Sequence, residues 1–572
     1  MRIITLHCDY IRFKPVKKAI KNPEELSEEK KKEIIVKDPL VVLTAIEKGD
    51  NDQIIKQLIE SVKKTASEVK AKKIVLYPYA HLSNQLADPT TALEYLVEAA
   101  NVLQKEGFEV TRAPFGYYKE FELKCKGHPL SELSKEFRVE GAIQTAQPVK
   151  KLSKEGGKII LDRRNLKPND HRILGEDLGI FYLSDEIGPG LPLWLPNGET
   201  IRNQLIQYMR EIEEKYGYKY VSTPHITKRH LYEKTGHIPY YAETMFSPMK
   251  IDETDYYLKP MNCPHHHIIF TKIVKSYRDL PLRLAEAGAV YRNELSGVTY
   301  GLTRVRSMTQ NDAHLYVTEE QLKDEFVKVI NMFDEALGAL KIKDFWFRLS
   351  LPDFKNNPEK YTGDPKIWDN ASESIKKAMK ETKKKYTEGS GEAAFYGPKI
   401  DVQIKNSQGK EETLATSQVD IVVPQRMELN YINEKGEKKI PIVIHRAILG
   451  SYERFVSFLL EQTNGNLPLW LSPIQVRIIN FTDRNFKTCE KVLSEIKKEL
   501  PLLRIDSDFR NTTVSDKIRD ASLMKIPHIV VIGDKEEKNN TLAVRTRDGK
   551  VKYDIKTKDF VSEIKEKIEK RD

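Results

Sequence analysis

The chain has 572 residues, of which 40% are hydrophobic and 31% charged, and its formal net charge is +10. This length predicts roughly three to five domains. The excess of basic residues favours a polyanionic partner such as nucleic acid, although a lysine-rich protein without such a partner has the same composition. Four widely separated cysteines exclude a disulfide framework and fit a reducing compartment. We expect neither a signal peptide nor a membrane-spanning segment.

Residues 1–140 read as a compact α/β unit in which short apolar strands alternate with amphipathic helices. The charged segment 17–34 is expected to be a solvated excursion. The expected strands are "RIITLHC", "KKIVLYPYA", "FEVTRAPF" and "YKEFELKCK". The expected apolar helix faces are Ile54, Ile55, Leu58, Ile59 and Val62, and then Leu93, Leu96, Val97, Ala100 and Leu103.

Three further segments follow. Residues 141–185 are polar and rich in Lys, Gly and Asp, which predicts a linker. Residues 186–468 form the largest unit, with a long helix that ends at Gly217 and, near its end, antiparallel strands joined by a Gly-containing turn. Residues 469–572 alternate strands and helices in an order that predicts a separate α/β domain with a mostly parallel core sheet.

The strongest chemical signal lies in "YRNELSGVTYGLTRVRSMTQNDAHLY" (291–316). Arg292 and Glu294 are two residues apart, as are Arg304 and Arg306, so each pair is expected on one face of a strand. A Gly/Ser turn between the pairs predicts a hairpin with guanidinium groups on one face. Guanidinium groups bind phosphate and carboxylate with bidentate geometry.

A second signal is "LKPMNCPHHHIIF" (258–270), where a cysteine precedes three consecutive histidines. Cysteine and histidine are common ligands of zinc. Three adjacent histidines cannot all point one way on a regular element. A compact metal cluster within this run is therefore not expected.

The hairpin and the downstream "HRAILGSYERF" (445–455) resemble motifs 2 and 3 of class II aminoacyl-tRNA synthetases, and "GPGLPLWLPNG" with the long helix and "YVSTPHI" resembles motif 1. Within that class, "KPMNCP", "TQNDAH", "AFYGPKID" and "IHRAILGS" resemble the threonyl-tRNA synthetase family. The resemblance is continuous over about residues 185–572. It implies a class II catalytic domain at 186–468, built on an antiparallel sheet with helices. It also implies a homodimer formed along the motif 1 helix and the strand around Pro224.

The same resemblance assigns one zinc ion per chain to Cys263, His314 and His445. Three protein ligands leave a fourth position for substrate. Threonine and valine are nearly isosteric, and an apolar pocket separates such pairs by only about a hundredfold. An open zinc could take both the amino group and the hydroxyl of threonine. Residues that resemble the family's threonine-binding residues are Met261, Gln310, Asp312 and Tyr396.

The resemblance also implies ATP with Mg²⁺. Arg292 matches the arginine that bridges the α-phosphate and the amino acid carboxylate, Arg454 the arginine on the other side of ATP, and Lys399 points to the same region. These three are the candidate catalytic residues. The candidate ATP-binding residues are Arg292, Glu294, Arg304, Met308, Gln418 and Arg454. Met308 departs from the aromatic residue that relatives often carry, but methionine can still pack on an adenine ring.

The two ends of the chain resemble family modules that act on tRNA. Residues 469–572 resemble the anticodon-binding domain, and Asn511, Glu536 and Arg545 match residues that read anticodon bases. Residues 1–140 resemble the archaeal-type editing domain, which has the fold of D-aminoacyl-tRNA deacylases. Editing is physically expected, because serine differs from threonine by one methyl group, worth only about 10–200-fold in discrimination. The candidate editing residues are His81, Tyr118, Lys119 and Glu132.

Together these observations predict a cytoplasmic enzyme that activates L-threonine with ATP, transfers it to tRNA(Thr) and hydrolyses mischarged seryl-tRNA(Thr). No Ser–His–Asp set is present in the editing region, so a positioned water is the expected nucleophile there. Two alternatives stay open at this stage. One is a synthetase-like paralogue that binds tRNA or regulates, and the other is a sister class II synthetase for serine or proline.

Overall fold

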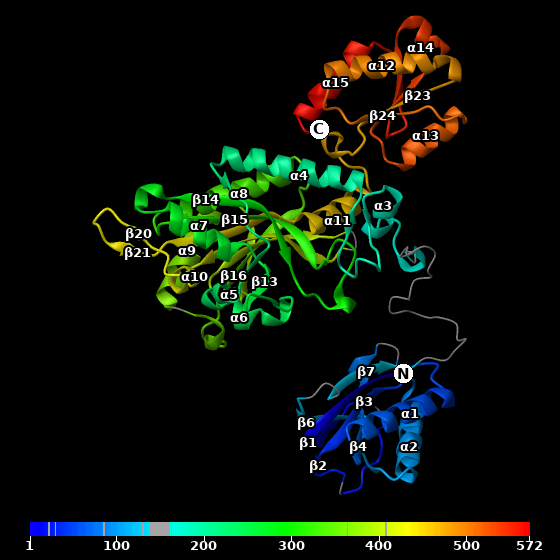
Figure 1. Cartoon of the computed structure of the whole chain (residues 1–572), viewed down its shortest axis with the longest axis vertical. Coiled ribbons are helices and arrows are strands. Elements are labelled where there is room, and N and C mark those ends of the chain that lie inside the picture. Colours follow the sequence, from blue (N-terminus) through cyan, green and yellow to red (C-terminus); the bar gives the residue numbers. More distant parts are fainter. Residues whose placement is uncertain are drawn as a thin grey trace. The chain divides into compact units, whose positions relative to one another are not determined.

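A computed structural model of the chain (Figure 1) describes residues 1–572 except 21, 22, 29, 84, 85, 128–130, 138–160, 162, 363, 407 and 408. The chain divides into two compact units, Met1–Lys150 and Lys151–Asp572, which are described separately. Among the described residues, no helix combines the length and the apolar character that crossing a membrane requires.

Unit 1 is built on a seven-stranded sheet whose longest strand, β1, takes part in four pairings. The first part of β1 pairs with β3 and β7, and its second part pairs with β2 and β6, all antiparallel. Strands β3, β4 and β5 continue the sheet as parallel neighbours. The strands are β1 (Arg2–Lys18), β2 (Ile34–Lys37), β3 (Pro39–Ala45), β4 (Lys73–Pro78), β5 (Glu109–Arg112), β6 (Tyr117–Cys125) and β7 (Glu132–Glu136).

Helices α1 (Asp52–Glu68) and α2 (Pro89–Lys105) lie side by side against this sheet (Figure 1). The side chains of Asn51 and Asp88 accept hydrogen bonds from first-turn backbone N–H groups and so cap the two helices. The apolar face predicted for α1 is buried.

The face predicted for α2 is only partly correct. Leu96, Ala100 and Leu103 are buried, but Leu93 and Val97 are half-exposed. Ala92 and Ala99 take their places because the sheet lies closer to the small side chains of this helix.

The charged segment 17–34 is also not simply solvated. Glu24 pairs with both guanidinium nitrogens of Arg112 and accepts a hydrogen bond from the backbone N–H of Phe115 at 3.1 Å. This carboxylate therefore fastens the excursion to the end of β5 and to the connection between β5 and β6.

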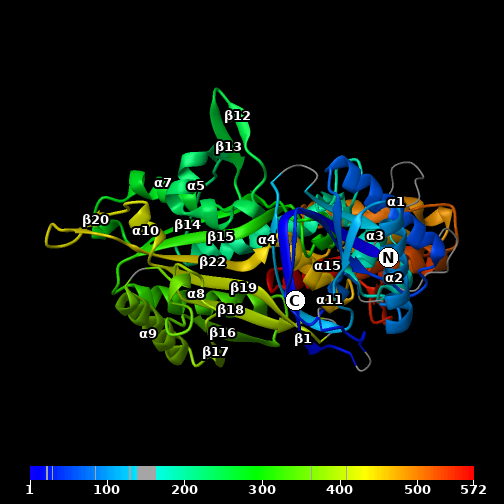
Figure 2. The same cartoon turned by 90° about the horizontal axis from the view of Figure 1, so that it is seen from below.

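Unit 2 contains an eight-stranded, mostly antiparallel sheet with helices on both faces, as the resemblance implied. Helices α8 (Leu322–Gly338) and α9 (Pro365–Glu381) cover one face, and α5 (Arg229–Thr235) and α7 (Cys263–Ile273) lie on the other (Figure 2). In spatial order the strands are β10 (Lys219–Tyr220), β14 (Leu282–Tyr291), β15 (Ser307–Val317), β22 (Ile442–Ser451), β19 (Glu411–Asp420), β18 (Lys399–Lys405), β16 (Phe345–Leu351) and β17 (Tyr386–Ser390).

Strand β15 turns its apolar side chains to the core and its polar side chains to the opposite face of the sheet. Ala313, Leu315 and Val317 are buried with α8 in the main core. Because alternate side chains point to opposite faces, the intervening Asp312 and His314 lie on the side of α7. The helices α4 (Pro196–Lys215) and α11 (Tyr452–Thr463) complete this core, and the predicted face of α4, which includes Leu205 and Met209, is buried.

The predicted linker 141–185 is partly wrong. Residues 141–160 lie outside the described part, but the later residues form α3 (His171–Asp177) and strand β8 (Phe181–Tyr182). Leu174 and Leu178 join the main core. The buried His171 is held by Glu461 Oε1, 2.7 Å from its Nδ1, and by the backbone N–H of Leu302, 3.2 Å from its Nε2. Polar composition suggested a linker, whereas these few apolar residues and the histidine fix the segment.

The C-terminal sheet has the order β24-β23-β25-β26-β27. Its first three strands are parallel, but β26 and β27 are antiparallel, so the mostly parallel sheet that was predicted is instead mixed. The short connections before β26 and β27 permit only antiparallel pairing. The elements are β23 (Val476–Asn480), α12 (Phe486–Glu499), β24 (Ile505–Asp508), α13 (Val514–Leu523), β25 (His528–Ile532), α14 (Asp534–Asn539), β26 (Leu542–Thr546), β27 (Val551–Ile555) and α15 (Thr557–Glu569).

Short elements complete unit 2. They are β9 (Leu193–Trp194), β11 (Ile226–Lys228), α6 (His237–Tyr240), β12 (Met249–Ile251), β13 (Thr254–Leu258), α10 (Val423–Arg426), β20 (Tyr431–Ile432) and β21 (Lys438–Lys439). The last two strands form the predicted antiparallel hairpin that leads into β22.

Candidate active site

Four neighbouring strands place one polar side chain each in a row across the sheet. Lys399 of β18 stands opposite Gln418 of β19, which stands opposite His445 of β22, which stands opposite His314 of β15. Residues in register on adjacent strands project from the same face. The register thus gathers four predicted site residues that are far apart in the sequence.

A sulfur and two imidazoles converge beside this row. One ligand atom from each of Cys263, His314 and His445 lies within 4.8 Å of the others. Cys263 is the first residue of α7, and burial raises the pKa of its thiol, while burial lowers the pKa of His314. A bound cation reverses the first preference, because it favours the thiolate, and it agrees with the second, because it binds the neutral imidazole. The donor set is one that suits zinc.

The three consecutive histidines, 265–267, do not form a metal cluster of their own, which agrees with the prediction. His266 and His267 are buried, and His267 Nδ1 lies 2.9 Å from the hydroxyl of Tyr316. His265 is half-buried, and neither of its ring nitrogens has a hydrogen-bond partner within the described structure. The three rings therefore have three different environments.

Two polar residues beside the cluster were missed by the sequence reasoning. His237 of α6 places Nε2 3.7 Å from Cys263 Sγ and 3.2 Å from Met261 Sδ. Asp420 is fully buried, and its Oδ2 lies 3.0 Å from His445 Nε2. No local pattern marked either residue, because each acquires its position from the pairing of strands and helices distant in sequence.

The predicted threonine-binding residues surround this cluster. Asp312 Oδ2 accepts a hydrogen bond from Asn262 Nδ2 at 2.9 Å. The hydroxyl of Tyr396 donates to Gln418, and the ring of Tyr396 lies 5.8 Å from that of His445. Gln310 lies on β15 two residues before Asp312 and pairs with Ser451.

The predicted arginine hairpin exists, but its charged residues lie beyond the strands. Strand β14 ends at Tyr291 and β15 begins at Ser307. Arg292 and Glu294 are instead held by a turn, in which the backbone N–H of Glu294 donates to the carbonyl of Arg292 at 2.8 Å. Arg304 reaches back to the Glu294 carboxylate at 2.8 Å. Burial lowers the pKa of Arg292, whereas 55% of the Arg304 side chain is exposed.

The remaining ATP candidates occupy neighbouring elements. Met308 lies on β15 opposite Val290. Lys399 Nζ is 2.7 Å from Asp401, and Arg454 lies in the first turn of α11 with 41% of its side chain exposed. The hydroxyl of Ser451 caps that helix by accepting from the backbone N–H of Arg454.

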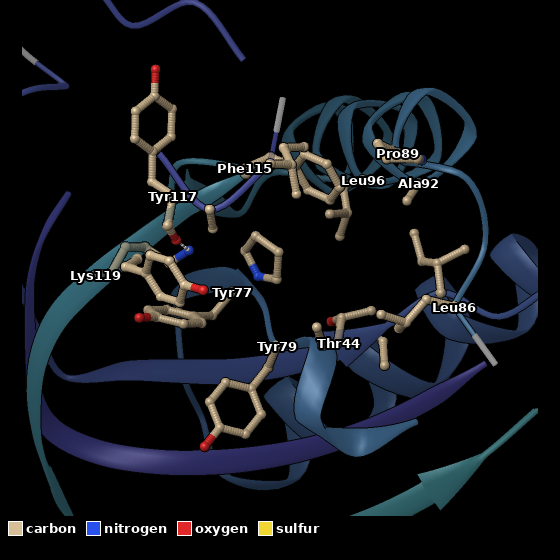
Figure 3. Close-up of a pocket in the computed structure, with 18 of the residues that line it drawn as sticks. Thr44, Tyr77, Tyr79, Leu86, Pro89, Ala92, Leu96, Phe115, Tyr117 and Lys119 are labelled. Carbon is tan, nitrogen blue, oxygen red and sulfur yellow. Dashed lines mark hydrogen bonds between the residues drawn. The ribbon is translucent and has the colours of Figure 1, made fainter. Parts of the chain in front are cut away.

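Unit 1 contains a cavity of about 480 Å³ lined by Tyr77, Tyr79, Phe115 and Lys119, with the first turns of α2 on its other side (Figure 3). Tyr118 also lines it. Lys119 Nζ donates to the carbonyls of Pro114 and Tyr117 at 2.9 and 3.0 Å, and burial lowers its pKa to about 8.

The other two editing candidates stand differently. Glu132 is exposed on β7, where it pairs with Leu6 of β1, and it does not line the cavity. His81 belongs to the short helix η1 (Ala80–Leu82), but its side chain is outside the described part.

The three predicted anticodon residues come from three elements of the C-terminal domain. Asn511 lies in the loop between β24 and α13 and is exposed. Glu536 lies on α14 and accepts a hydrogen bond from the backbone N–H of Gly533 at 3.1 Å. Arg545 lies on β26 and contacts the carbonyl of Gly549 at 3.4 Å.

Three family models match the chain in the order of these parts. Residues 1–137 match the archaea-specific editing domain of threonyl-tRNA synthetase. Residues 245–463 match the class II tRNA synthetase core domain (G, H, P, S and T), and residues 475–567 match the anticodon binding domain. The crystal structure of the RNA binding domain of threonyl-tRNA synthetase from Cryptosporidium parvum Iowa II is 32% identical, with a TM-score of 0.65, and the match covers 70% of this chain and 98% of that one. The chain belongs to the threonyl-tRNA synthetase family.

Bacterial threonine–tRNA ligases are also similar to this member of the threonyl-tRNA synthetase family. That of Bacillus velezensis is 42% identical over 396 residues, or 69% of this chain and 61% of the relative. Threonine–tRNA ligase 1 of Bacillus subtilis is 44% identical over 379 residues, or 66% of this chain and 59% of the relative. The chain thus spans about three fifths of the length of these curated relatives.

Proposed function

We propose that this chain is a threonine–tRNA ligase that activates L-threonine with ATP and Mg²⁺ and transfers the threonyl group to tRNA(Thr). The observation that carries the proposal is the meeting of Cys263, His314 and His445 beside Asp312, on a sheet face continuous with Gln418 and Lys399. The names of the similar bacterial proteins support threonine over serine or proline as the substrate.

We propose that Cys263, His314 and His445 hold one zinc ion. When bound, zinc supplies a Lewis acid that can take the amino group and the hydroxyl of threonine together. Asp312, held by Asn262, is placed to accept a hydrogen bond from the substrate hydroxyl. Valine has no hydroxyl to donate to this carboxylate, so one acceptor position of Asp312 would be left without its substrate partner.

The arginines are proposed to stabilise charge during activation. The threonine carboxylate attacks the α-phosphorus of ATP, a bond to phosphorus forms, and pyrophosphate leaves with the electron pair of the broken bond. Arg292 would bind the α-phosphate oxygens, and Arg454 the phosphates from the other side. A desolvated guanidinium such as that of Arg292 stabilises developing negative charge more strongly than one in water. Both arginines being present argues against a paralogue that only binds tRNA.

Unit 1 is proposed to hydrolyse seryl-tRNA(Thr) in the cavity beside Lys119. The cavity offers aromatic walls and one buried ammonium group, and the first 137 residues match the editing-domain model. A water molecule would attack the ester carbonyl, which Lys119 would polarise. The bond from the acyl carbon to the ribose oxygen of the tRNA would then break, the water proton would pass to that oxygen, and serine and tRNA would be released. Glu132 has no place in this cavity, so we propose no role for it in the cleavage step.

We further propose that the enzyme is a cytoplasmic homodimer formed along α4 and the segment around Pro224, with the C-terminal domain reading the anticodon. Four free cysteines support a reducing compartment. The net charge of +10 supports tRNA as a partner.

The deciding experiment is ATP–pyrophosphate exchange with threonine, serine and valine, before and after removal of metal by a chelator. We expect threonine-dependent exchange that the chelator abolishes and added zinc restores. A zinc-loaded, folded protein without threonine-dependent exchange would exclude the ligase function.

A further inference from the structure

Behind His314 lies a buried row of polar side chains that no step above uses. His266 of α7 places Nδ1 2.8 Å from His314 Nδ1 and Nε2 3.1 Å from Glu286 Oε2 of β14. His266 is fully buried, and Glu286 is 6% exposed. The ring of His314 is thus contacted on its Nδ1 side by a second imidazole, which is contacted in turn by a carboxylate.

Glu286 is held as a carboxylate. The backbone N–H and the hydroxyl of Thr223 donate to it at 2.8 and 2.9 Å, and the ammonium group of Lys259 lies 3.5 Å away. Burial raises the pKa of Glu286, but the hydrogen bond from His266 and the charge of Lys259 outweigh burial and lower the pKa from 4.5 to about 2. An ionised carboxylate only accepts hydrogen bonds, so the proton between Glu286 and His266 is on His266 Nε2.

The 2.8 Å contact joins Nδ1 of His266 to Nδ1 of His314, so one of these atoms donates and the other accepts. Since His266 donates from Nε2 to Glu286, its Nδ1 can act as the acceptor, with the proton of the contact on Nδ1 of His314. The Nε2 of His314 then carries a lone pair. A metal ion needs such a lone pair. The alternative tautomer of His314 would present a proton to the metal instead.

We propose that Glu286 and His266 are positioning residues that fix the ring orientation and the tautomer of His314 for zinc. This inference rests on the proposed zinc site and extends it to two residues that do not touch the metal. It also assigns different roles to the histidines of the run. His266 acts through His314, whereas His265, without a hydrogen-bond partner in the described structure, has no part in the device.

The test is zinc affinity, measured on the full chain by competition with a chromophoric chelator. We expect Glu286→Gln and His266→Gln to weaken zinc binding by about 10- to 100-fold, the range typical of partners behind a metal ligand. His266→Asn should lose less, because its amide oxygen can replace Nδ1 as the acceptor for His314, whereas glutamine reaches only the Nε2 position. The absorption spectrum of the cobalt-substituted protein should change in the same order, since it reports the geometry around the metal.

His265→Ala is the matched control, one residue away on the same helix, and should bind zinc like the native chain. Thermal unfolding of the metal-free proteins separates weak binding from general damage. Zinc affinities of Glu286→Gln and His266→Gln within twofold of the native value would overturn the inference while leaving the zinc site intact. A native protein that binds no zinc would instead overturn the proposed function.

Discussion

Glu213, in the last turns of α4, and Arg446, on β22, form an ion pair of 2.6 Å in which both side chains are fully buried. Glu213 Oε1 also accepts a hydrogen bond from Asn311 of β15 at 2.9 Å. Arg446 and Asn311 are direct neighbours in sequence of His445 and Asp312, whose side chains lie on the opposite face. One carboxylate therefore ties together, from below, the two strands that carry the candidate site.

Removing one partner of this pair should be far more costly than removing an exposed pair. Glu213→Ala leaves a buried guanidinium without a counter-charge, and we expect a loss of about 3–5 kcal/mol in the free energy of unfolding. Lys215→Ala, which breaks the solvent-exposed pair with Glu335, should cost about 1 kcal/mol or less. Urea unfolding of both variants measures the difference, and equal losses would contradict the assignment of Glu213 as a buried anchor.

The three proposed zinc ligands should be interchangeable in their effect. Cys263→Ala, His314→Ala and His445→Ala are each expected to abolish stoichiometric zinc and threonine-dependent exchange, because two protein ligands do not make a stable zinc site. Metal analysis of the purified proteins checks this. The control is Cys489→Ala, a buried cysteine of the C-terminal domain, which should keep one zinc per chain. Full zinc in any of the three ligand variants would remove that residue from the site.

Arg292→Lys should keep the positive charge but lose the planar fork that binds two oxygens at once. We expect the activation rate at saturating substrates to fall about 100- to 1000-fold, the usual cost of losing a donor to the developing charge. Arg278→Lys, a change at an exposed position of the short helix η4 (Tyr277–Asp279), is the control. Single-turnover formation of threonyl-adenylate is the measurement, and a loss confined to KM would argue against a role in the transition state.

Lys119→Met should abolish the hydrolysis of seryl-tRNA(Thr) while threonine activation continues. The pKa of Lys119 is about 8 because the group is buried, so its ammonium form predominates below pH 8 and is lost as the pH rises. If that form polarises the ester, the enzymatic rate, after subtraction of spontaneous hydrolysis, should fall above pH 8. Lys119→Arg would extend the plateau to higher pH. A rate that rises through pH 8 would indicate that neutral Lys119 acts as a base.

Glu24 gives a prediction for the acid stability of unit 1. Burial raises its pKa, but hydrogen bonds from Arg112, the Phe115 backbone and Lys30 outweigh burial and lower it from 4.5 to about 2. An acid whose pKa is lower in the folded than in the unfolded chain stabilises the fold at any pH above its unfolded pKa. This contribution is lost as the pH falls from about 4.5 towards 2. Glu24→Gln should therefore be less stable than the native chain at pH 7, with a gap that closes below pH 4.5. Thermal unfolding across that range measures the gap, and a gap independent of pH would contradict the charge pairing.

Two kinds of feature could be predicted from the sequence: those marked by a local residue pattern and those marked by short motifs that resemble the family. Helix α1 follows its apolar period, and Cys263, His314 and His445 meet as the resemblance implied. The same reasoning placed Arg292 and Glu294 on a strand, because a period of two also occurs in a turn. It placed the α2 face incorrectly, because small residues such as Ala92 weigh little in an apolar pattern but pack closest to the sheet.

The supporting carboxylates could not be found in this way. Glu286 lies 20 residues from His266, and His266 lies 48 residues from His314. Asp420 and Glu213 also find their partners only through strand pairing and helix packing. The sequence has 84 acidic residues, and no local pattern shows which of them become buried. Their roles follow from three-dimensional neighbours alone.

The row formed by Lys399, Gln418, His445 and His314 has a consequence for how this protein can change. Each side chain faces the site only because its strand is aligned with the next, and the irregularities between Gln310 and Asp312 and between Val402 and Gln403 lie outside the regular pairing that holds the row. Inserting or deleting one residue in a strand turns its side chains to the opposite face. The catalytic sheet should accordingly accept exchanges of one side chain for another far more readily than changes in strand length, while insertions should accumulate in the connecting loops.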